Sequence, residues 1–159
     1  MTSEERRVLI GKVRALPSAA ETAVRGLTDA QLDTPYGEGK WTVRQVVHHL
    51  ADSHVMAFAR TKQVLLEDNP KLFVYDQNDW AMTADAHAPS PVGPSLEILR
   101  GVHARWATLL ESLPEPAWAR KGLHFRRGEM TLEDLLALYA RHGENHVRQI
   151  TDLRAARGW

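Results

Sequence analysis

Apolar residues recur every three to four positions over four long stretches of the chain, which predicts four amphipathic α-helices. These stretches cover residues 2–26, 42–67, 93–113 and, in the fourth, 131–153. Each is long enough to span a small domain at about 1.5 Å per residue. The pattern predicts an all-α protein: a four-helix bundle, running up-down-down-up, that forms a single domain over residues 1–159.

The second stretch carries the clearest helix start. Thr42 and Gln45 have the spacing of a capping box, and Trp41 and Val46 have the spacing of a hydrophobic staple. The fourth stretch begins with a weaker version of the same pattern. In the first stretch, Pro17 is expected to kink or interrupt the helix, because proline lacks the backbone N–H that a helix needs.

Three connections separate the helices. Residues 27–40 contain proline and glycine and are predicted to form a connector. Residues 70–92 predict a long crossover between the second and third helices, with a short helix near 77–84. Residues 117–129 are too short and too charged for a core helix and predict a hairpin-like excursion.

Charge and composition exclude several function classes. The 159 residues contain 20 Lys and Arg and 20 Asp and Glu, and no basic run with interleaved aromatics, which argues against a nucleic-acid partner. No apolar window is long enough for a membrane span, and the N-terminus lacks a hydrophobic signal core, so we expect a cytoplasmic protein. Without cysteine, the chain has no thiol nucleophile and no thiolate ligand.

Three histidines lie on the apolar stripes of predicted helices. His142 and His146 are four residues apart, so their side chains share one helix face, and His49 lies on the second helix. Burying an imidazole without a partner costs about 1–3 kcal/mol, and a shared metal ion would remove that cost. Three protein ligands leave coordination positions open, as catalytic sites require. The alternative is that each histidine is hydrogen-bonded within the core.

Two other histidines, His48 and His54, lie near His49 on the second helix, and helical phase predicts a different environment for each. His48 is in phase with polar positions and is expected to face a wetter side, which is why His49 is preferred as the third ligand. His54 shares a face with Val47 and Leu50 and is expected to lie in the core or behind the ligands.

Common catalytic motifs are missing. Gly143 follows His142, so the HExxH pattern of zinc peptidases is absent, and neither a G-x-S-x-G elbow nor a glycine-rich phosphate loop occurs. No catalytic residue can be assigned. Asp52 and Glu144 are the candidate general bases nearest to the histidines in sequence.

Two further residues are candidates for substrate binding. Arg60, on the same helix as His49, could neutralise an anionic ligand, although the favoured alternative for such an arginine is a surface salt bridge. Trp80, on the crossover, could line a pocket above the bundle.

Several segments resemble the YfiT branch of the DinB-like four-helix-bundle proteins, in order from Trp41 to Ile150. They read WTVRQVVHHLADSH, FARTKQVLLEDNP, YDQNDWA, HARW and LYARHGENHVRQI. The resemblance implies one divalent metal per chain, held by His49, His142 and His146, and a homodimer. Members of this branch are described as metal-dependent hydrolases, and some as bacillithiol S-transferases.

Three functions follow as hypotheses. In the first, Zn²⁺ or Ni²⁺ activates a small bacillithiol-like thiol for transfer to an electrophilic substrate, which suits a chain without cysteine. In the second, the metal activates water for hydrolysis. In the third, the protein is a stress-related bundle that binds metal or haem without catalysis. Three imidazoles suit several metals, so the sequence alone does not fix the ion.

Overall fold

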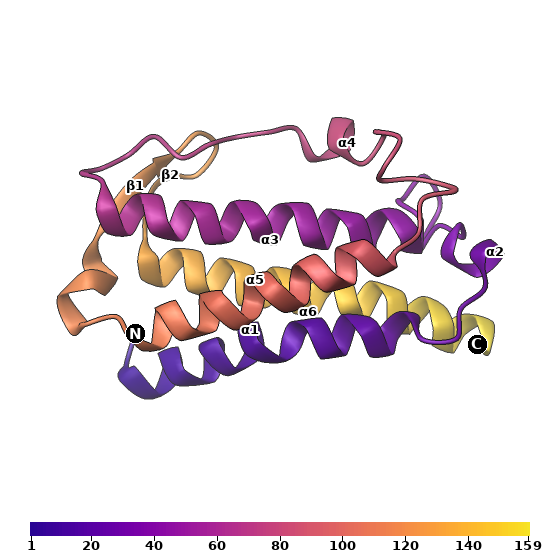
Figure 1. Cartoon of the computed structure of the whole chain (residues 1–159), viewed down its shortest axis with the longest axis horizontal. Helices are drawn as coiled ribbons and strands as arrows, with labels where there is room; N and C mark the ends of the chain where they lie inside the picture. The colour runs from indigo at the N-terminus through magenta and orange to yellow at the C-terminus, as the bar shows by residue number, and fades with distance from the viewer.

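In the computed structural model, which describes all 159 residues, four long helices lie side by side along the length of the molecule (Figure 1). They are α1 (Ser3–Val24), α3 (Val43–Leu66), α5 (Gly93–Glu111) and α6 (Leu132–Arg157). The predicted four-helix bundle is therefore confirmed. None of the helices combines the length and the apolar character needed to cross a membrane.

The helix directions follow the predicted up-down-down-up order. α1 and α6 run one way, and α3 and α5 run the other way (Figure 1). α1 packs against α5 and α6, and α3 packs against the same two helices. α3 and α6 are therefore neighbours, although their residues are far apart in the sequence.

Capping boxes set where α3 and α6 begin. In α3, the Thr42 hydroxyl accepts from the Gln45 N–H at 3.1 Å, and the Gln45 side chain accepts from the Thr42 N–H at 3.0 Å. Thr131 and Asp134 make the same reciprocal pair at the start of α6. Each box satisfies two N–H groups that the first helical turn leaves free. The start of both helices is thereby fixed by short-range signals.

α1 continues through Pro17 as one helix, so the expected interruption does not occur. Pro17 cannot donate to the Val13 carbonyl four residues earlier. The His103 side chain of α5 donates to that oxygen instead, from Nδ1 at 2.6 Å, and His103 is fully buried. The neighbouring helix thus replaces the hydrogen bond that proline removes.

The links between helices carry the small elements. The 27–40 connector contains α2 (Asp29–Leu32), which the sequence did not predict, and the crossover contains α4 (Gln77–Trp80). After α5 come the 3₁₀ helix η1 (Glu115–Ala119) and the hairpin of β1 (Lys121–His124) and β2 (Gly128–Thr131). The predicted excursion is a hairpin, but it starts at 121 because residues 115–119 form a separate 3₁₀ helix.

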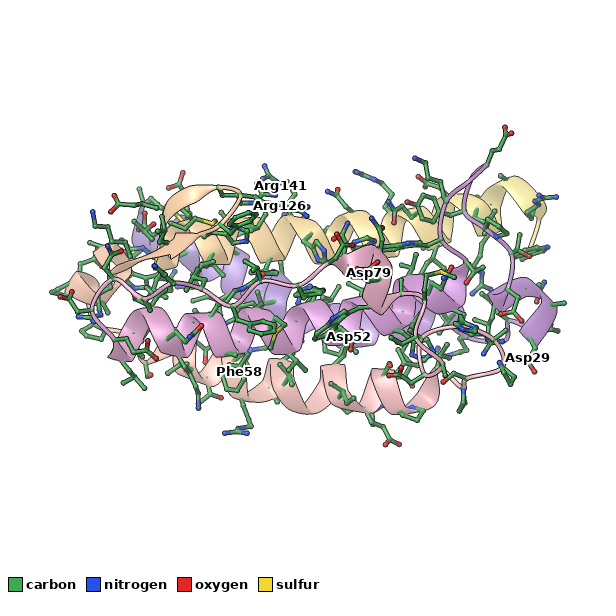
Figure 2. The ribbon with its side chains drawn as sticks, turned by 90° about the horizontal axis from the view of Figure 1, so that it is seen from above. Asp29, Asp52, Phe58, Asp79, Arg126 and Arg141 are labelled. Atoms are coloured by element: carbon green, nitrogen blue, oxygen red, sulfur yellow. The ribbon has the colours of Figure 1, made fainter.

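The crossover and the hairpin lie together above the bundle. The antiparallel pair β1–β2 has Gly122 opposite Met130. Leu123 of β1 donates to the Pro70 carbonyl at 2.8 Å and accepts from the Leu72 N–H at 3.0 Å. Seen from above, the crossover runs over α3 and α6, and the hairpin lies over the first half of α6 (Figure 2).

The apolar interior forms two main clusters along the bundle. The larger one surrounds Trp106 and includes the first turns of α6, and the other lies near the beginning of α3 and the end of α6. His49 of α3 and the histidine pair of α6 lie between these clusters. The histidines therefore sit in the middle of the bundle, where packing on both sides holds α3 and α6 in place.

Candidate metal centre

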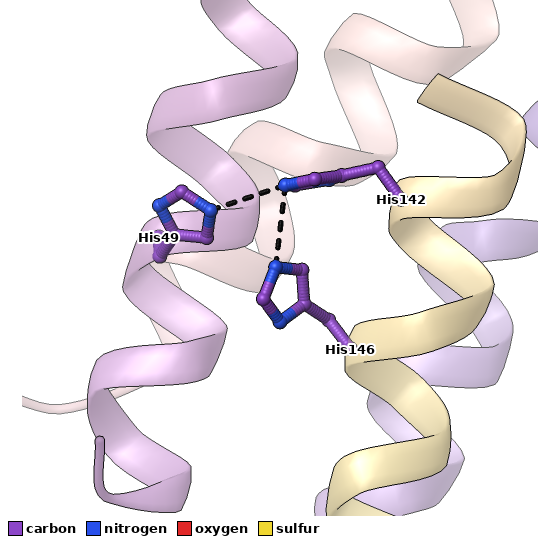
Figure 3. A group of neighbouring side chains, drawn as sticks. All are labelled: His49, His142 and His146. Atoms are coloured by element: carbon purple, nitrogen blue, oxygen red, sulfur yellow. Dashed lines mark hydrogen bonds between the residues drawn. The ribbon is translucent and has the colours of Figure 1, made fainter. Parts of the chain in front are cut away.

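The three predicted histidines meet between α3 and α6 (Figure 3). The Nε2 atom of His142 lies 3.2 Å from Nε2 of His49 and 3.2 Å from Nε2 of His146. One nitrogen from each of the three side chains lies within 4.8 Å of the other two. His142 and His146 come from successive turns of α6, so the helix period brings their rings together, and α3 supplies His49 from the facing side.

This arrangement fits a zinc-sized ion. Two nitrogens bonded to one tetrahedral ion at about 2.0–2.1 Å lie about 3.3 Å apart, close to the 3.2 Å from His142 Nε2 to the nitrogens of His49 and His146. Only three protein nitrogens converge, and no carboxylate belongs to the group. The donor set is therefore that of an open site rather than a closed structural one.

Groups behind the ligands hold two of the rings. His146 Nδ1 lies 2.8 Å from the side-chain oxygen of Gln149, which can only accept, so Nδ1 carries the proton and Nε2 keeps its lone pair. His142 Nδ1 lies 3.1 Å from Nε2 of His54, which is fully buried. Such outer partners orient metal-binding imidazoles and fix their tautomers. His54 was expected to lie either in the core or behind the ligands, and it lies behind His142.

Burial keeps these imidazoles neutral. Desolvation and, to a smaller extent, the neighbouring charge of His146 together lower the pKa of His49 to about 3. Desolvation, followed by the charges of His146 and His49, holds the pKa of His142 well below its usual value. The pKa of His146 is also lowered by burial. Neutral imidazole is the form that binds a metal, so the site needs no deprotonation at neutral pH.

Trp41 forms one side of the trio. Its ring centroid lies 4.6 Å from that of His49, and it stacks on His146 at 6.3 Å. The sequence pattern assigned Trp41 only to a hydrophobic staple, and it does pack against the cluster that contains Val46. Its position two helical turns before His49 was the available signal for the second role.

The expected wetter environment of His48 is wrong. Its side chain is buried, and Nδ1 lies 2.8 Å from the hydroxyl of Ser95. Ser95 belongs to the first turn of α5, which covers this face of α3. His48 therefore faces α5, whereas His49 faces α6 and joins the trio.

A cavity of about 410 Å³ opens beside the trio. Two of the three histidines, His49 and His142, lie in its wall. The remaining wall comes from α3, the crossover, the hairpin and α6, which contribute Ser53, Arg60, Val74, Tyr75, Gln77, His124, Arg126, Arg127, Leu138 and Tyr139.

The two predicted substrate-binding residues have different positions. Arg60 lines the cavity and is 5% exposed, and it donates to the Tyr139 hydroxyl and to the Phe73 carbonyl. The alternative of a surface salt bridge is therefore wrong. Trp80 does not line the cavity; its ring packs against Tyr75, at 4.3 Å between centroids, and Tyr75 is the residue that faces inward.

Neither candidate general base reaches the cavity. Asp52 lies on the side of α3 turned away from α6 (Figure 2), and burial, with the charge of Asp85, raises its pKa to about 6. Glu144 pairs with Lys12 at 2.9 Å on the outside of the bundle. The cavity wall contains no carboxylate from any element.

The hairpin supplies cavity residues that sequence reasoning did not find. His124, Arg126 and Arg127 line the cavity, and none of them was predicted from the sequence as a candidate site residue. The available signal was the FRRG run inside the predicted excursion, where two cations follow one another at a turn.

Comparisons with known proteins identify the family of this chain. Residues 13–150 match the DinB superfamily. A relative from Geobacillus kaustophilus, named "Putative metal-dependent hydrolase GK0616", is 51% identical over 94% of this chain and 84% of its own length. "Putative metal-dependent hydrolase YfiT" from Bacillus subtilis is 40% identical over 100% of this chain and 89% of its own length.

A solved structure shares the whole fold. It is YfiT from Bacillus subtilis, described as a probable metal-dependent hydrolase with an unusual four-helix bundle topology. It superposes with a TM-score of 0.96 at 38% identity, covering 100% of this chain and 91% of the other. With the superfamily match over most of the chain, these likenesses show that the protein belongs to the YfiT-like members of the DinB superfamily.

Proposed function

We propose that this protein is a metal-dependent enzyme in which His49, His142 and His146 hold one Zn²⁺ or Ni²⁺. One observation carries the proposal: three neutral imidazole nitrogens converge within 4.8 Å beside an open cavity. An ion held by imidazoles alone keeps its full double charge, since no carboxylate neutralises it. The outward-facing nitrogens are already held by His54 and Gln149, so ligand orientation does not depend on the ion.

The favoured reaction is transfer of a small thiol, such as bacillithiol, to an electrophile. When bound, the metal supplies a Lewis acid that deprotonates a thiol. A sulfur–carbon bond then forms, the bond from carbon to the leaving group breaks, and the thiol proton leaves to solvent. Tyr139 accepts a hydrogen bond from Arg60 and keeps its own O–H, which can donate to the departing group.

The absence of a carboxylate at the cavity supports transfer over hydrolysis. Hydrolysis benefits from a general base that takes a proton from water within hydrogen-bond reach. Asp52 and Glu144 do not line the cavity, so neither serves that role. A thiol ionises far more readily than water and needs no such base.

Hydrolysis is the second candidate, because the curated relatives carry the name of metal-dependent hydrolases. A water molecule activated by a three-histidine zinc ion has a pKa of about 7 and is a competent nucleophile. The third candidate, a bundle that binds metal or haem without catalysis, predicts binding without turnover. The homodimer implied by the family resemblance stays a prediction. Sedimentation would test it by measuring the mass of the protein in solution.

One experiment separates these candidates. The purified protein is loaded with Zn²⁺ or Ni²⁺, and bacillithiol conjugation to an alkylating electrophile is followed beside the hydrolysis of simple esters. His146→Ala should lose metal and conjugation, while His87→Ala, a histidine on the crossover outside the trio, should keep both. Equal conjugation rates in His146→Ala and the unaltered protein would refute metal-dependent transfer. Ester hydrolysis without conjugation would support the hydrolase.

A further inference from the structure

The cavity contains a buried cation without a counterion. Arg60 is 5% exposed, yet it forms no ion pair with any carboxylate. Its guanidinium donates to two uncharged oxygens, of Tyr139 and Phe73, and lies 6.0 Å from the ring centroid of Tyr75. Arginine is rarely buried without a charged partner, because desolvating the guanidinium is costly.

Contrast with the other buried arginines makes this unusual. Arg6 pairs with Glu115 and Glu133, and Arg44 pairs with Asp29 and Asp33. Both satisfy their charge within the protein. Arg60 is the buried arginine that lines the cavity, and it is the one that lacks such a partner.

Two more cations face the same space from the hairpin. Arg126 and Arg127 line the cavity, and only Arg126 has an acidic neighbour, Asp76, at 3.6 Å in an exposed pair. The cavity wall therefore holds three arginines and no Asp or Glu. Exposed pairs of that kind contribute little and exchange readily with other anions.

The positive field at this end of the cavity also acts on His124. Its pKa is lowered by burial and, beyond that, by the charges of Arg60, Arg127 and Arg126. The charges of all three arginines therefore act on the same side chain, although the arginines come from α3 and from the hairpin. A region of one sign of charge with partly buried walls attracts ligands of the opposite sign.

We propose that Arg60, Arg126 and Arg127 form an oxyanion subsite, which binds a carboxylate or phosphate group of the small molecule that reacts at the histidine trio. Arginine suits this role because its planar fork binds both groups through two parallel hydrogen bonds. A cavity of about 410 Å³ accommodates a small molecule that spans both ends. The reacting end of the molecule rests on the proposed function, whereas the anion-binding end does not.

The test measures binding of succinate and inorganic phosphate, with neutral succinamide as the reference, by calorimetry at constant ionic strength. Metal-loaded and chelator-treated protein are both titrated. His146→Ala is included, because it removes any contribution from a metal. We expect both anions to bind the chelated protein and His146→Ala, and succinamide not to bind. A preference for succinate or for phosphate identifies which oxyanion the subsite takes.

Arg126→Ala and Arg127→Ala test the assigned residues, since both lie on the exposed hairpin and spare the core. Loss of a charged hydrogen bond worth about 1.5–3 kcal/mol corresponds to about ten-fold or more weaker binding. Arg25→Ala, an exposed arginine outside the cavity, removes the same charge and should leave binding unchanged. Arg127→Lys should recover part of the lost affinity.

Binding that is absent, or that falls equally in Arg127→Ala and Arg25→Ala, would overturn the subsite. Anion binding in a protein that shows neither conjugation nor hydrolysis would leave the subsite standing and refute the proposed enzyme. Conjugation in a protein that binds neither anion would support the proposed enzyme and refute the subsite.

Discussion

The hydrogen bond from His103 to Val13 predicts a measurable coupling between two helices. Pro17 leaves the Val13 carbonyl without its helical donor, and the buried His103 side chain takes the place of that donor at 2.6 Å. Replacing His103 with leucine therefore leaves a buried carbonyl unpaired. That loss should lower the free energy of unfolding by about 1–3 kcal/mol.

The same replacement should cost less when residue 17 can donate. Pro17→Ala restores the backbone N–H, so the Val13 carbonyl keeps a partner without His103. One net hydrogen bond is worth about 1 kcal/mol, so the cost of His103→Leu should fall by about that amount in the Pro17→Ala background. The unpaired Nε2 of His103 is removed in both backgrounds and cancels from the difference.

A double-mutant cycle measured by urea unfolding of the metal-free protein checks this value. Additive effects, within about 0.3–0.5 kcal/mol, would refute the compensation. Ser95→Ala is the matched control, because it removes another buried side-chain partner on α5 whose hydrogen bond goes to His48 of α3. Its effect should be the same whether residue 17 is the native proline or carries the Pro17→Ala change.

Four other outcomes are expected. Gly143→Ala should destabilise the fold by about 1–3 kcal/mol through overpacking, because its Cβ would lie 2.5 Å from a methyl of Leu16. The control Gly101→Ala has open space around it and should stabilise the fold by up to about 1 kcal/mol. Equal effects of the two variants in a denaturant titration would contradict this. Thr42→Ala should cost about 1 kcal/mol of stability in the same titration, and no loss would show that the capping box is dispensable. Zinc at about 100 times its dissociation constant should raise the free energy of unfolding by about 2.7 kcal/mol, and His146→Ala should abolish the increase. Burial lowers the pKa of the histidines inside the bundle, so unfolding takes up protons below about pH 6.5. The stability of the metal-free protein should therefore be full above that pH and fall toward pH 5. A denaturation midpoint that does not change with pH would contradict this.

The helices and the histidine trio could be predicted because their signals are local. Thr42 and Gln45 mark a helix start by their spacing alone, and the four-residue interval between His142 and His146 fixes their common face. Helical phase also selected His49 over its neighbour. Once α3 and α6 lie side by side, the meeting of the three rings follows from these phases.

The failures arose where a distant segment decides the environment. Helical phase placed His48 toward solvent, but the first turn of α5 covers it through Ser95. Pro17 was expected to kink or interrupt its helix. The interruption does not occur, and the donor that replaces the missing N–H comes from His103 on another helix. Such partners depend on the packing of elements far apart in the chain, which periodicity does not report.

The cavity was the least predictable part for the same reason. Arg126 and Arg127 reach it only because the hairpin folds back over α6 and is tied to the crossover at Leu123. Trp80 was expected to face the cavity, but its neighbour Tyr75 does so instead. In a segment without regular structure, the sequence does not indicate which aromatic side chain points inward.

The two sides of the cavity come from different kinds of structure. The histidine trio belongs to rigid helices, whereas the crossover and the hairpin supply most of the remaining contacts. Loops tolerate substitution and insertion far better than packed helices. Descendants of this scaffold could therefore exchange one class of reactant for another by altering two surface segments while the chemistry beneath them stays intact.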